Sequence, residues 1–320
     1  MTLRVLVEDQ TIEAKFTMAP GFHAVFGASG VGKTTLFRMI SGLLRPRVEY
    51  LTWNDVAFHQ NSPRHRPVAW VPQRVHLIPE RTIGQQVTWV HGHDRFDDLS
   101  DWLDILHLHE LWAKYPREVS GGELQRAGLL RALVAKRPIL LLDEALSQVD
   151  RPLRDAIVTY LKERRRPQHL VIFTSHDWEE TVAHADTVLW MNQGSPVNAP
   201  QSPRTLLPDN PLMARLMGYI GAIPNGHGQY WLVHPNTIRV GAWPDQGPVL
   251  VGQLHVDPLS PVSIRYHFRA TDSNWSWVGP PSPASSQTEI TLVNPYLVPF
   301  SIHSSTNIDP EQKKGVDRCP

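Results

Sequence analysis

The sequence has 320 residues, a length that predicts two domains, or one large domain with an appendage. Lysine plus arginine and aspartate plus glutamate both total 31, so the formal charge is zero, which argues against a nucleic-acid binder or a polybasic membrane-surface protein. Hydrophobic residues make up 41% and charged residues 19%, which excludes wholesale disorder. We therefore expect a folded chain that recognises its partners locally and binds no nucleic acid.

The single cysteine and the N-terminal sequence bear on the compartment. Cys319 cannot by itself form an intramolecular disulfide, a thiolate zinc site or an iron–sulfur cluster, which favours a reducing compartment. The N-terminal MTLRVLVEDQ lacks the apolar segment and cleavage site of a signal peptide, and no stretch approaches the length of a membrane span. We expect a protein that does not cross a membrane by itself.

The chain begins with a predicted β-hairpin, because apolar residues alternate in 3–7 and in 12–18. A third, short apolar strand at 23–26 runs directly into the glycine-rich segment GASGVGKTT at 27–35. The apolar residues that follow have helical spacing up to about Gly42. The order is therefore strand, glycine loop, helix.

The middle of the chain predicts strands that alternate with helices. A strand is expected at 68–71, a mainly helical region at about 74–136, and within it a helix at 97–106 with one apolar face. The run 139–142 is continuously aliphatic, as a parallel strand covered on both faces requires, and 170–174 repeats that pattern after another helix. This alternation predicts an α/β fold.

From about residue 230 the sequence changes to short runs of residues that favour β-strands. The runs are 231–233, 237–240, 249–256, 262–268 and 289–293. With proline, glycine and asparagine between them, they predict a small all-β domain at 230–303 after an α/β domain at 1–225. Residues 279–286 are expected to form a mobile loop and residues 304–320 a disordered tail.

The glycine-rich segment matches G-x-x-x-x-G-K-[ST] completely. The expected nucleotide-binding residues are Gly27, Ala28, Ser29, Gly30, Val31, Gly32, Lys33, Thr34 and Thr35. The glycines let backbone amides converge on a phosphate, Lys33 can reach the β- and γ-phosphates, and the Thr34 hydroxyl can ligate Mg²⁺. A coincidental glycine turn is the alternative, and the strand before and helix after the motif argue against it.

Two carboxylates follow the aliphatic run. A carboxylate at the C-terminal end of a parallel strand beside a phosphate-binding loop is placed to hold Mg²⁺, and we assign Asp143 to the metal. Glu144 is then free to orient and polarise an attacking water. An exposed acidic pair at a strand end is the alternative interpretation.

A helix start at residue 120 carries the most specific motif. By itself Ser120-Gly121-Gly122 is a flexible N-cap. However, SGGELQR shortly before an aliphatic-Asp-Glu strand resembles the signature of ATP-binding cassette (ABC) ATPases. Gln73 in WVPQ resembles the family's Q-loop glutamine, residues 147–150 (SQVD) its D-loop, and His176 in TSHD its switch histidine. All of these elements occur in the family's order and spacing.

The resemblance implies a P-loop ABC ATPase fold, with a RecA-like core sheet, an antiparallel β subdomain and a helical subdomain at about 74–136. It also implies that Ser120, Gly121 and Gly122 contact the γ-phosphate bound by a second copy, so that hydrolysis requires a head-to-tail dimer. Gln73 would contact Mg²⁺ and the lytic water, His176 would contact the γ-phosphate, and Asp150 would link the two sites. Catalysis would be positioning and electrostatic stabilisation.

Three positions depart from the family pattern. Ala145 stands where proline is usual and should loosen the turn, and Glu123 stands where glutamine is commoner. Residues 8–11 offer no aromatic side chain to stack on adenine. Phe16 is the nearest aromatic but fits the predicted strand better than a stacking platform, so aliphatic contacts to the base are expected.

Other clusters have ordinary explanations that we favour. The histidines of 91–94 and of 107–109 suggest metal ligation, but without further matched ligands solvated turns are expected. The basic run 162–166 suggests nucleic-acid binding, but it sits at a helix end, where cations complement the helix dipole.

The resemblance extends to import systems. Residues 74–95 resemble the groove that receives a coupling helix of the membrane subunit, and 234–240 resembles the entry strand of a TOBE-type β domain, although that resemblance is partial. The chain up to about residue 225 is most similar to molybdate/sulfate-type importer ATPases. These features imply an ATP-hydrolysing subunit at the cytoplasmic face of the inner membrane, which energises uptake through separate permease subunits and, indirectly, an extracytoplasmic solute-binding protein.

An oxyanion such as molybdate is the expected solute, with sulfate, iron, sugar or polyamine import as alternatives. A soluble ABC ATPase outside transport would keep the same motifs but would not usually carry a TOBE-like domain. A P-loop GTPase would require an N-K-x-D motif, which the sequence lacks. A regulatory, ligand-sensing role of the C-terminal domain is compatible with the importer hypothesis.

Overall fold

A computed structural model describes residues 1–298 with gaps. The positions outside the description are 11, 92–98, 147–148, 165–168, 193–196, 198, 204–205, 207–210, 220, 225–229, 234–237, 241–248, 261–262, 271–272, 280–286, 293–295 and 299–320. The chain forms two compact units, Met1–Leu206 and Leu207–Pro320. The composition change near residue 230 predicts a later boundary than this. No helix among the described residues is long and apolar enough to span a membrane.

The first unit opens with a four-stranded antiparallel sheet of order β2-β1-β4-β5. Its strands are β1 (Leu3–Glu8), β2 (Glu13–Met18), β4 (Val48–Trp53) and β5 (Val56–Ala57). In β1 and β2 alternate residues are buried, which confirms the predicted hairpin. β4 was not predicted from the sequence. Its burial does not alternate along the strand, and its pairing with β1 makes it a strand.

A second, parallel sheet forms the centre of this unit. Its strands are β3 (Gly21–Phe26), β6 (Val68–Val71), β7 (Ile139–Leu142), β8 (Leu170–Ser175) and β9 (Thr187–Trp190), in the order β6-β7-β8-β3-β9. Every residue of β7 and β8 is buried, as their continuous aliphatic runs predict. The edge strand β9, which pairs with β3, is absent from the sequence prediction.

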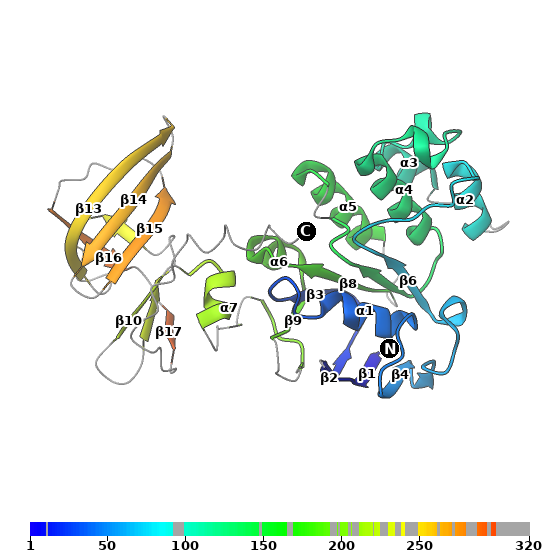
Figure 1. The fold of residues 1–320 in the computed structure, drawn as a ribbon, viewed down its shortest axis with the longest axis horizontal. Coiled ribbons are helices and arrows are strands. Elements are labelled where there is room, and N and C mark those ends of the chain that lie inside the picture. Colours follow the sequence, from blue (N-terminus) through cyan, green and yellow to red (C-terminus); the bar gives the residue numbers. More distant parts are fainter. Residues whose placement is uncertain are drawn as a thin grey trace. The chain divides into compact units, whose positions relative to one another are not determined.

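Helices cover the parallel sheet (Figure 1). They are α1 (Lys33–Ser41), α2 (Ile83–His91), α3 (Leu99–Ile105), α4 (Gly121–Leu133), α5 (Arg151–Arg164) and α6 (Trp178–His184), with 3-10 helices at Pro63–His65, His109–Leu111 and Pro116–Glu118. Figure 1 shows α2, α3 and α4 gathered on one side of the parallel strands, and α4 packs against α2 and β6. This arrangement agrees with the expected α/β fold with a helical subdomain.

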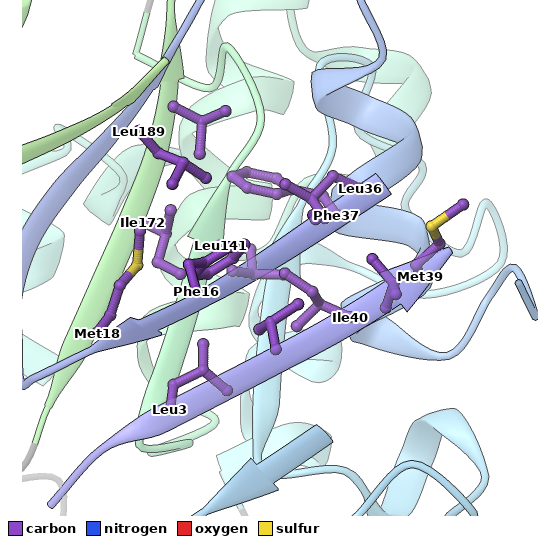
Figure 2. Close-up of a cluster of buried hydrophobic side chains, with 14 of the residues drawn as sticks. Leu3, Phe16, Met18, Leu36, Phe37, Met39, Ile40, Leu141, Ile172 and Leu189 are labelled. Carbon is purple, nitrogen blue, oxygen red and sulfur yellow. The ribbon is translucent and has the colours of Figure 1, made fainter. Parts of the chain in front are cut away.

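Helix α1 lies in the main hydrophobic core. Its buried side chains include Leu36, Phe37 and Ile40, which pack with residues of the antiparallel sheet and of β7, β8 and β9 (Figure 2). Phe16 belongs to the same cluster and is 5% exposed. Burial at roughly 25 cal/mol per Å² of apolar surface makes this cluster the anchor of α1 and of the glycine loop that precedes it.

A buried arginine fixes the end of α1. The Arg66 guanidinium, 1% exposed, donates to the carbonyl oxygens of Met39 (2.9 Å) and Ile40 (3.0 Å) and to Glu49 Oε1 (2.8 Å). Carbonyls at a helix C-terminus lack intrahelical partners, so this contact satisfies them inside the core. The chain leaves the helix at Gly42, whose φ of 81° is left-handed and whose missing Cβ leaves room for Arg66.

The described residues of the second unit form two antiparallel sheets and one short helix, α7 (Pro211–Leu216). One sheet has the order β10-β11-β17, from β10 (Gly221–Pro224), β11 (Tyr230–Val233) and β17 (Tyr296–Val298). The other has the order β12-β16-β13-β14-β15, from β12 (Ile238–Val240), β13 (Val249–Ser260), β14 (Ser263–Ala270), β15 (Ser273–Gly279) and β16 (Gln287–Leu292). The predicted β-strand content of this region is therefore present.

The strands β10, β15 and β17 are additions to that prediction. In the register between β14 and β15, Trp275 pairs with Phe268 and Trp277 with Tyr266, which gives two of the chain's eleven tryptophans a place in a sheet. Most of the expected loop at 279–286 and the whole expected tail at 304–320 lie outside the described residues.

Candidate functional site

The glycine loop connects β3 to α1 and has the backbone that its sequence predicts. Gly30 (φ 79°) and Gly32 (φ 110°) adopt left-handed conformations that other residues rarely tolerate. A Cβ at Gly27 would lie 2.5 Å from the carbonyl oxygen of Met191, so a side chain does not fit there. The loop leads into the N-terminus of α1, whose amides favour anions. Ser29 is exposed at its tip.

Lys33 is the first residue of α1 and is 5% exposed. Its Nζ donates to the carbonyl oxygens of Gly27 (2.8 Å) and Ala28 (2.9 Å), so the ammonium lies inside the loop. Burial lowers the pKa of Lys33 below its ordinary value, and the negative charges of Glu144 and Asp143 partly oppose that shift. The two carboxylates of β7 therefore act electrostatically on the P-loop lysine.

Asp143 follows β7 and is 1% exposed. Its amide donates to the Val71 carbonyl (2.9 Å) and its Oδ1 accepts from Thr174 Oγ1 (3.1 Å), whereas its buried Oδ2 has no hydrogen-bond partner among the described residues. A buried carboxylate oxygen without a partner is costly, and an oxygen ligand of this kind suits a hard cation such as Mg²⁺.

The described residues hold no group of three or more His, Cys, Asp or Glu side chains able to cage a metal by themselves. Mg²⁺ ordinarily binds through one or two carboxylates together with phosphate oxygens and water. Asp143 and the half-buried Thr34 fit that mode of binding.

Three of the predicted catalytic side chains come together at one edge of the parallel sheet. Gln73 follows β6, Glu144 follows β7 and His176 follows β8, so all three leave the C-terminal ends of neighbouring strands. Gln73 Nε2 donates to Glu144 Oε2 (2.6 Å), and His176 Nδ1 lies 4.0 Å from Glu144 Oε1. Glu144 itself has a left-handed backbone with φ of 48°.

Ser120 is the N-cap of α4, in a capping box with Glu123. Glu123 Oε2 accepts from the Ser120 amide (2.7 Å) and from Ser120 Oγ (2.9 Å), and these hydrogen bonds lower the pKa of the exposed Glu123. A Cβ on Gly121 or Gly122 would meet nothing within 4 Å. The described contacts of Ser120 thus stay within its own helix start, and the structure does not join this element to the glycine loop of the same chain.

The expected D-loop is described only in part, since residues 147–148 lie outside the description. Asp150 precedes α5, and its Oδ1 accepts from the Leu153 amide (3.0 Å), which is an N-cap contact.

Some functional contacts are missing from the sequence prediction. Thr174, the last residue of the strand predicted at 170–174, contacts both Asp143 and Glu144. Gln125 of α4 reaches the carbonyl oxygen of Ala145 (3.5 Å), so the turn expected to be loosened by alanine has a contact to the helical subdomain. The sequence signals for these two contacts are the threonine that ends an aliphatic run and the glutamine that follows SGGEL.

Phe16 is not available as an adenine platform, because its ring packs inside the core (Figure 2). Among the weaker clusters, His109 Nε2 pairs with Asp104 Oδ1 at 2.7 Å, and both side chains are more than half exposed. Side chains 91–94 lie outside the described set. Lys162, in the basic run, places its Nζ 5.5 Å from the centre of the Phe22 ring.

The fold and the site define a P-loop nucleotide-binding domain of the ABC type. Residues 13–147 match the family model described as ABC transporter. Among curated relatives, a molybdenum import ATP-binding protein of Aliivibrio fischeri is 30% identical over 195 residues, covering 58% of this chain and 54% of the relative. The sulfate/thiosulfate import ATP-binding protein of Mesorhizobium japonicum is 35% identical over 182 residues, 53% of each chain.

The matched segment spans about half the length of these curated relatives. Two solved structures share the fold. A bacterial Atm1-family ABC exporter with ATP bound has a TM-score of 0.56 at 23% identity, covering 67% of this chain and 41% of its own. An ATP-binding subunit of an ABC transporter has a TM-score of 0.56 at 18% identity, covering 63% and 90%.

Proposed function

We propose that this chain is the ATP-binding and ATP-hydrolysing subunit of an ABC import system. The observation that carries the proposal is the hydrogen bond between Gln73 and Glu144 at the sheet edge, with His176 beside it and the charge of Glu144 acting on Lys33 of the glycine loop. A strand-end carboxylate next to a P-loop, with a neighbouring glutamine that can orient water, is an arrangement suited to phosphoryl transfer to water.

The residue roles follow from this placement. Residues 27–35 cradle the triphosphate through backbone amides, and Lys33 reaches its β- and γ-oxygens. Asp143, Thr34 and Gln73 would hold Mg²⁺, which when bound neutralises charge on the β- and γ-phosphates. Glu144 orients and polarises the attacking water.

His176 adds a contact to the γ-phosphate and holds the water network in place. Adenine is contacted by aliphatic side chains, because residues 8–11 offer no aromatic side chain and Phe16 is buried in the core.

The complete site is formed by two copies of the chain. Ser120, Gly121 and Gly122 present a hydroxyl and backbone amides at the N-terminus of α4, which suits a phosphate. Their separation from the glycine loop of the same chain supports a head-to-tail dimer, in which each α4 completes the nucleotide site of the partner.

Import is the best supported task, because the similar curated proteins are import ATP-binding proteins for molybdenum and for sulfate or thiosulfate. We infer that separate permease subunits carry the solute, that this chain sits at the cytoplasmic face of the inner membrane, and that an extracytoplasmic binding protein acts indirectly. The β-rich second unit is proposed to contain a TOBE-like domain within 230–303, and molybdate is the proposed solute.

Two measurements test the proposal. Purified chain should hydrolyse ATP in the presence of Mg²⁺, and hydrolysis should stop with excess EDTA. In a strain that lacks its own molybdate-import ATPase, this chain expressed together with a molybdate permease should restore molybdate uptake. Restored sulfate uptake in the parallel strain would favour the sulfate alternative, and hydrolysis without any transport would favour a soluble, non-transport ATPase.

A further inference from the structure

We propose that the hydroxyl of Thr174 positions both functional carboxylates of the site, Asp143 and Glu144. The inference rests on the proposed ATPase function and adds a residue that does not itself touch nucleotide, cation or water. Thr174 lies in β8, is 5% exposed and follows the apolar residues of that strand.

The pairing of strands explains why this side chain reaches both the Asp143 carboxylate and the Glu144 backbone amide. β7 and β8 are parallel neighbours in which Leu142 pairs with Phe173, so Thr174 stands beside Asp143 as the two strands end. Thr174 Oγ1 donates to Asp143 Oδ1 (3.1 Å) and accepts from the Glu144 amide (2.8 Å). A hydroxyl has one proton to donate and two lone pairs, so it makes both hydrogen bonds at once.

The first hydrogen bond decides which oxygen of Asp143 remains for the cation. Oδ1 is occupied by the Thr174 hydroxyl, and the buried Oδ2 has no hydrogen-bond partner among the described residues. Without the hydroxyl, both oxygens of a carboxylate that is 1% exposed lose their fixed orientation. Partners of metal-ligating side chains commonly contribute 10- to 100-fold, as order-of-magnitude values, to metal affinity or activity.

The second hydrogen bond holds Glu144 in its unusual backbone conformation. Its φ of 48° is left-handed, a conformation that is unfavourable for a residue with a Cβ. The Thr174 hydroxyl accepts a hydrogen bond from the Glu144 amide. The Glu144 carboxylate in turn accepts a hydrogen bond from Gln73 Nε2 at 2.6 Å. Removing the hydroxyl lets the peptide relax to negative φ and carries the carboxylate away from Gln73.

A purely structural role is the alternative, in which Thr174 is only a satisfied buried hydroxyl. The two roles differ in what a variant loses. A structural role predicts loss of stability with unchanged chemistry per folded molecule. A positioning role predicts loss of kcat and of divalent-cation affinity. Nucleotide binding without metal should stay intact, because the Lys33 ammonium is held by the carbonyl oxygens of Gly27 and Ala28 and not by Thr174.

The experiment compares Thr174→Val, which keeps the shape but removes the hydroxyl, with Thr174→Ser, which keeps the hydroxyl. Thr52→Val is the matched control, because Thr52 is a buried strand threonine (2% exposed) whose Oγ1 has no partner among the described residues. Four quantities are measured: kcat and KM for ATP, affinity for a fluorescent ATP analogue in EDTA, Mn²⁺ affinity by electron paramagnetic resonance with a non-hydrolysable ATP analogue, and Tm.

We expect Thr174→Val to lower kcat and Mn²⁺ affinity by about 10- to 100-fold, with affinity for the analogue in EDTA unchanged. Thr174→Ser and Thr52→Val should stay close to wild type. Wild-type kcat and Mn²⁺ affinity in folded Thr174→Val would overturn the proposal, as would a Thr174→Ser variant as impaired as Thr174→Val. If Thr174→Val does not fold, Thr174→Cys, with its weaker hydrogen-bonding group, must fall below Thr174→Ser in both quantities.

The outcomes separate this inference from the proposed function. A wild-type chain that binds nucleotide and Mn²⁺ but does not hydrolyse ATP would refute the ATPase proposal, and the Mn²⁺ affinities of the variants would still decide the role of Thr174. A wild-type chain that binds neither would refute both.

Discussion

Glu144 is the side chain on which the proposed chemistry depends most. Its carboxylate accepts a hydrogen bond from Gln73, and its backbone is held by Thr174. The Glu144→Gln variant keeps the shape but cannot accept a proton from water, so we expect kcat for ATP to fall about 10²- to 10⁴-fold with nucleotide binding retained. The measurement is steady-state phosphate release together with equilibrium nucleotide binding.

Glu179→Gln, an exposed change on α6, serves as the control and should leave hydrolysis unaltered. Near wild-type hydrolysis by the Glu144→Gln variant would show that the water-activating assignment is wrong.

Lys33 should contribute to binding more than to folding. Its ammonium donates hydrogen bonds to the carbonyl oxygens of Gly27 and Ala28 in the loop. A triphosphate bound by the loop would therefore lie within reach of this ammonium. Lys33→Ala should weaken ATP binding by about 10- to 100-fold, the equivalent of one charge-assisted hydrogen bond. Isothermal titration of nucleotide into the variant and into the control Lys15→Ala, an exposed lysine of β2, measures the effect. Equal affinities in both variants would contradict the phosphate-binding role.

At the scale of elements, the contact between α5 and α6 predicts a pH dependence of stability. His184 Nε2 of α6 lies 3.2 Å from Asp155 Oδ1 of α5. Burial lowers the pKa of His184 below its ordinary value of 6.5; Lys162 and Arg154 act in the same direction, whereas Asp155 and Glu180 oppose it. Between the folded and the unfolded pKa the unfolded chain binds more protons, so the free energy of unfolding falls as the pH is lowered through that window.

His184→Gln should therefore flatten the pH dependence of stability below about pH 6.5. Urea unfolding of wild type, His184→Gln and the exposed-histidine control His109→Gln at several pH values tests this. The prediction fails if His184→Gln keeps the full wild-type slope, or if stability rises as the pH is lowered through the window.

Prediction of elements from sequence was good where the local pattern is strong. The hairpin of β1 and β2, the strands β6, β7 and β8, and the helix after the glycine loop follow from periodicity, because each pattern is complete within its own segment. The strands β4 and β9 were missed because their hydrogen-bonding partners, rather than their own residues, make them strands. The buried Arg66 that ends α1 is likewise visible only after folding.

For the whole molecule, the proposed composite site predicts that hydrolysis belongs to the dimer. Ser120→Arg places a bulky cation at the exposed start of α4, so it should spare ATP binding and stop hydrolysis. Ser62→Arg, at another exposed helix start, is the control and should hydrolyse ATP normally. Binding and phosphate release are measured on the same samples. Hydrolysis by a monomeric Ser120→Arg chain would rule out the shared site.

The sequence by itself determined the order of motifs and the α/β class, because a phosphate-binding loop and aliphatic strands are local patterns whose residue types have few substitutes. It also predicted that Asp143, Glu144, Gln73 and His176 belong to one site. The tertiary structure alone decided that Phe16 is buried in the core. It also decided that Thr174 contacts both the Asp143 carboxylate and the Glu144 backbone amide.

The physical reason is the strand order. Residues of β6, β7 and β8 are far apart in the chain but become neighbours in the sheet order β6-β7-β8-β3-β9. Contacts between strand ends therefore depend on which strands pair and in which register, and no single segment of sequence contains that information.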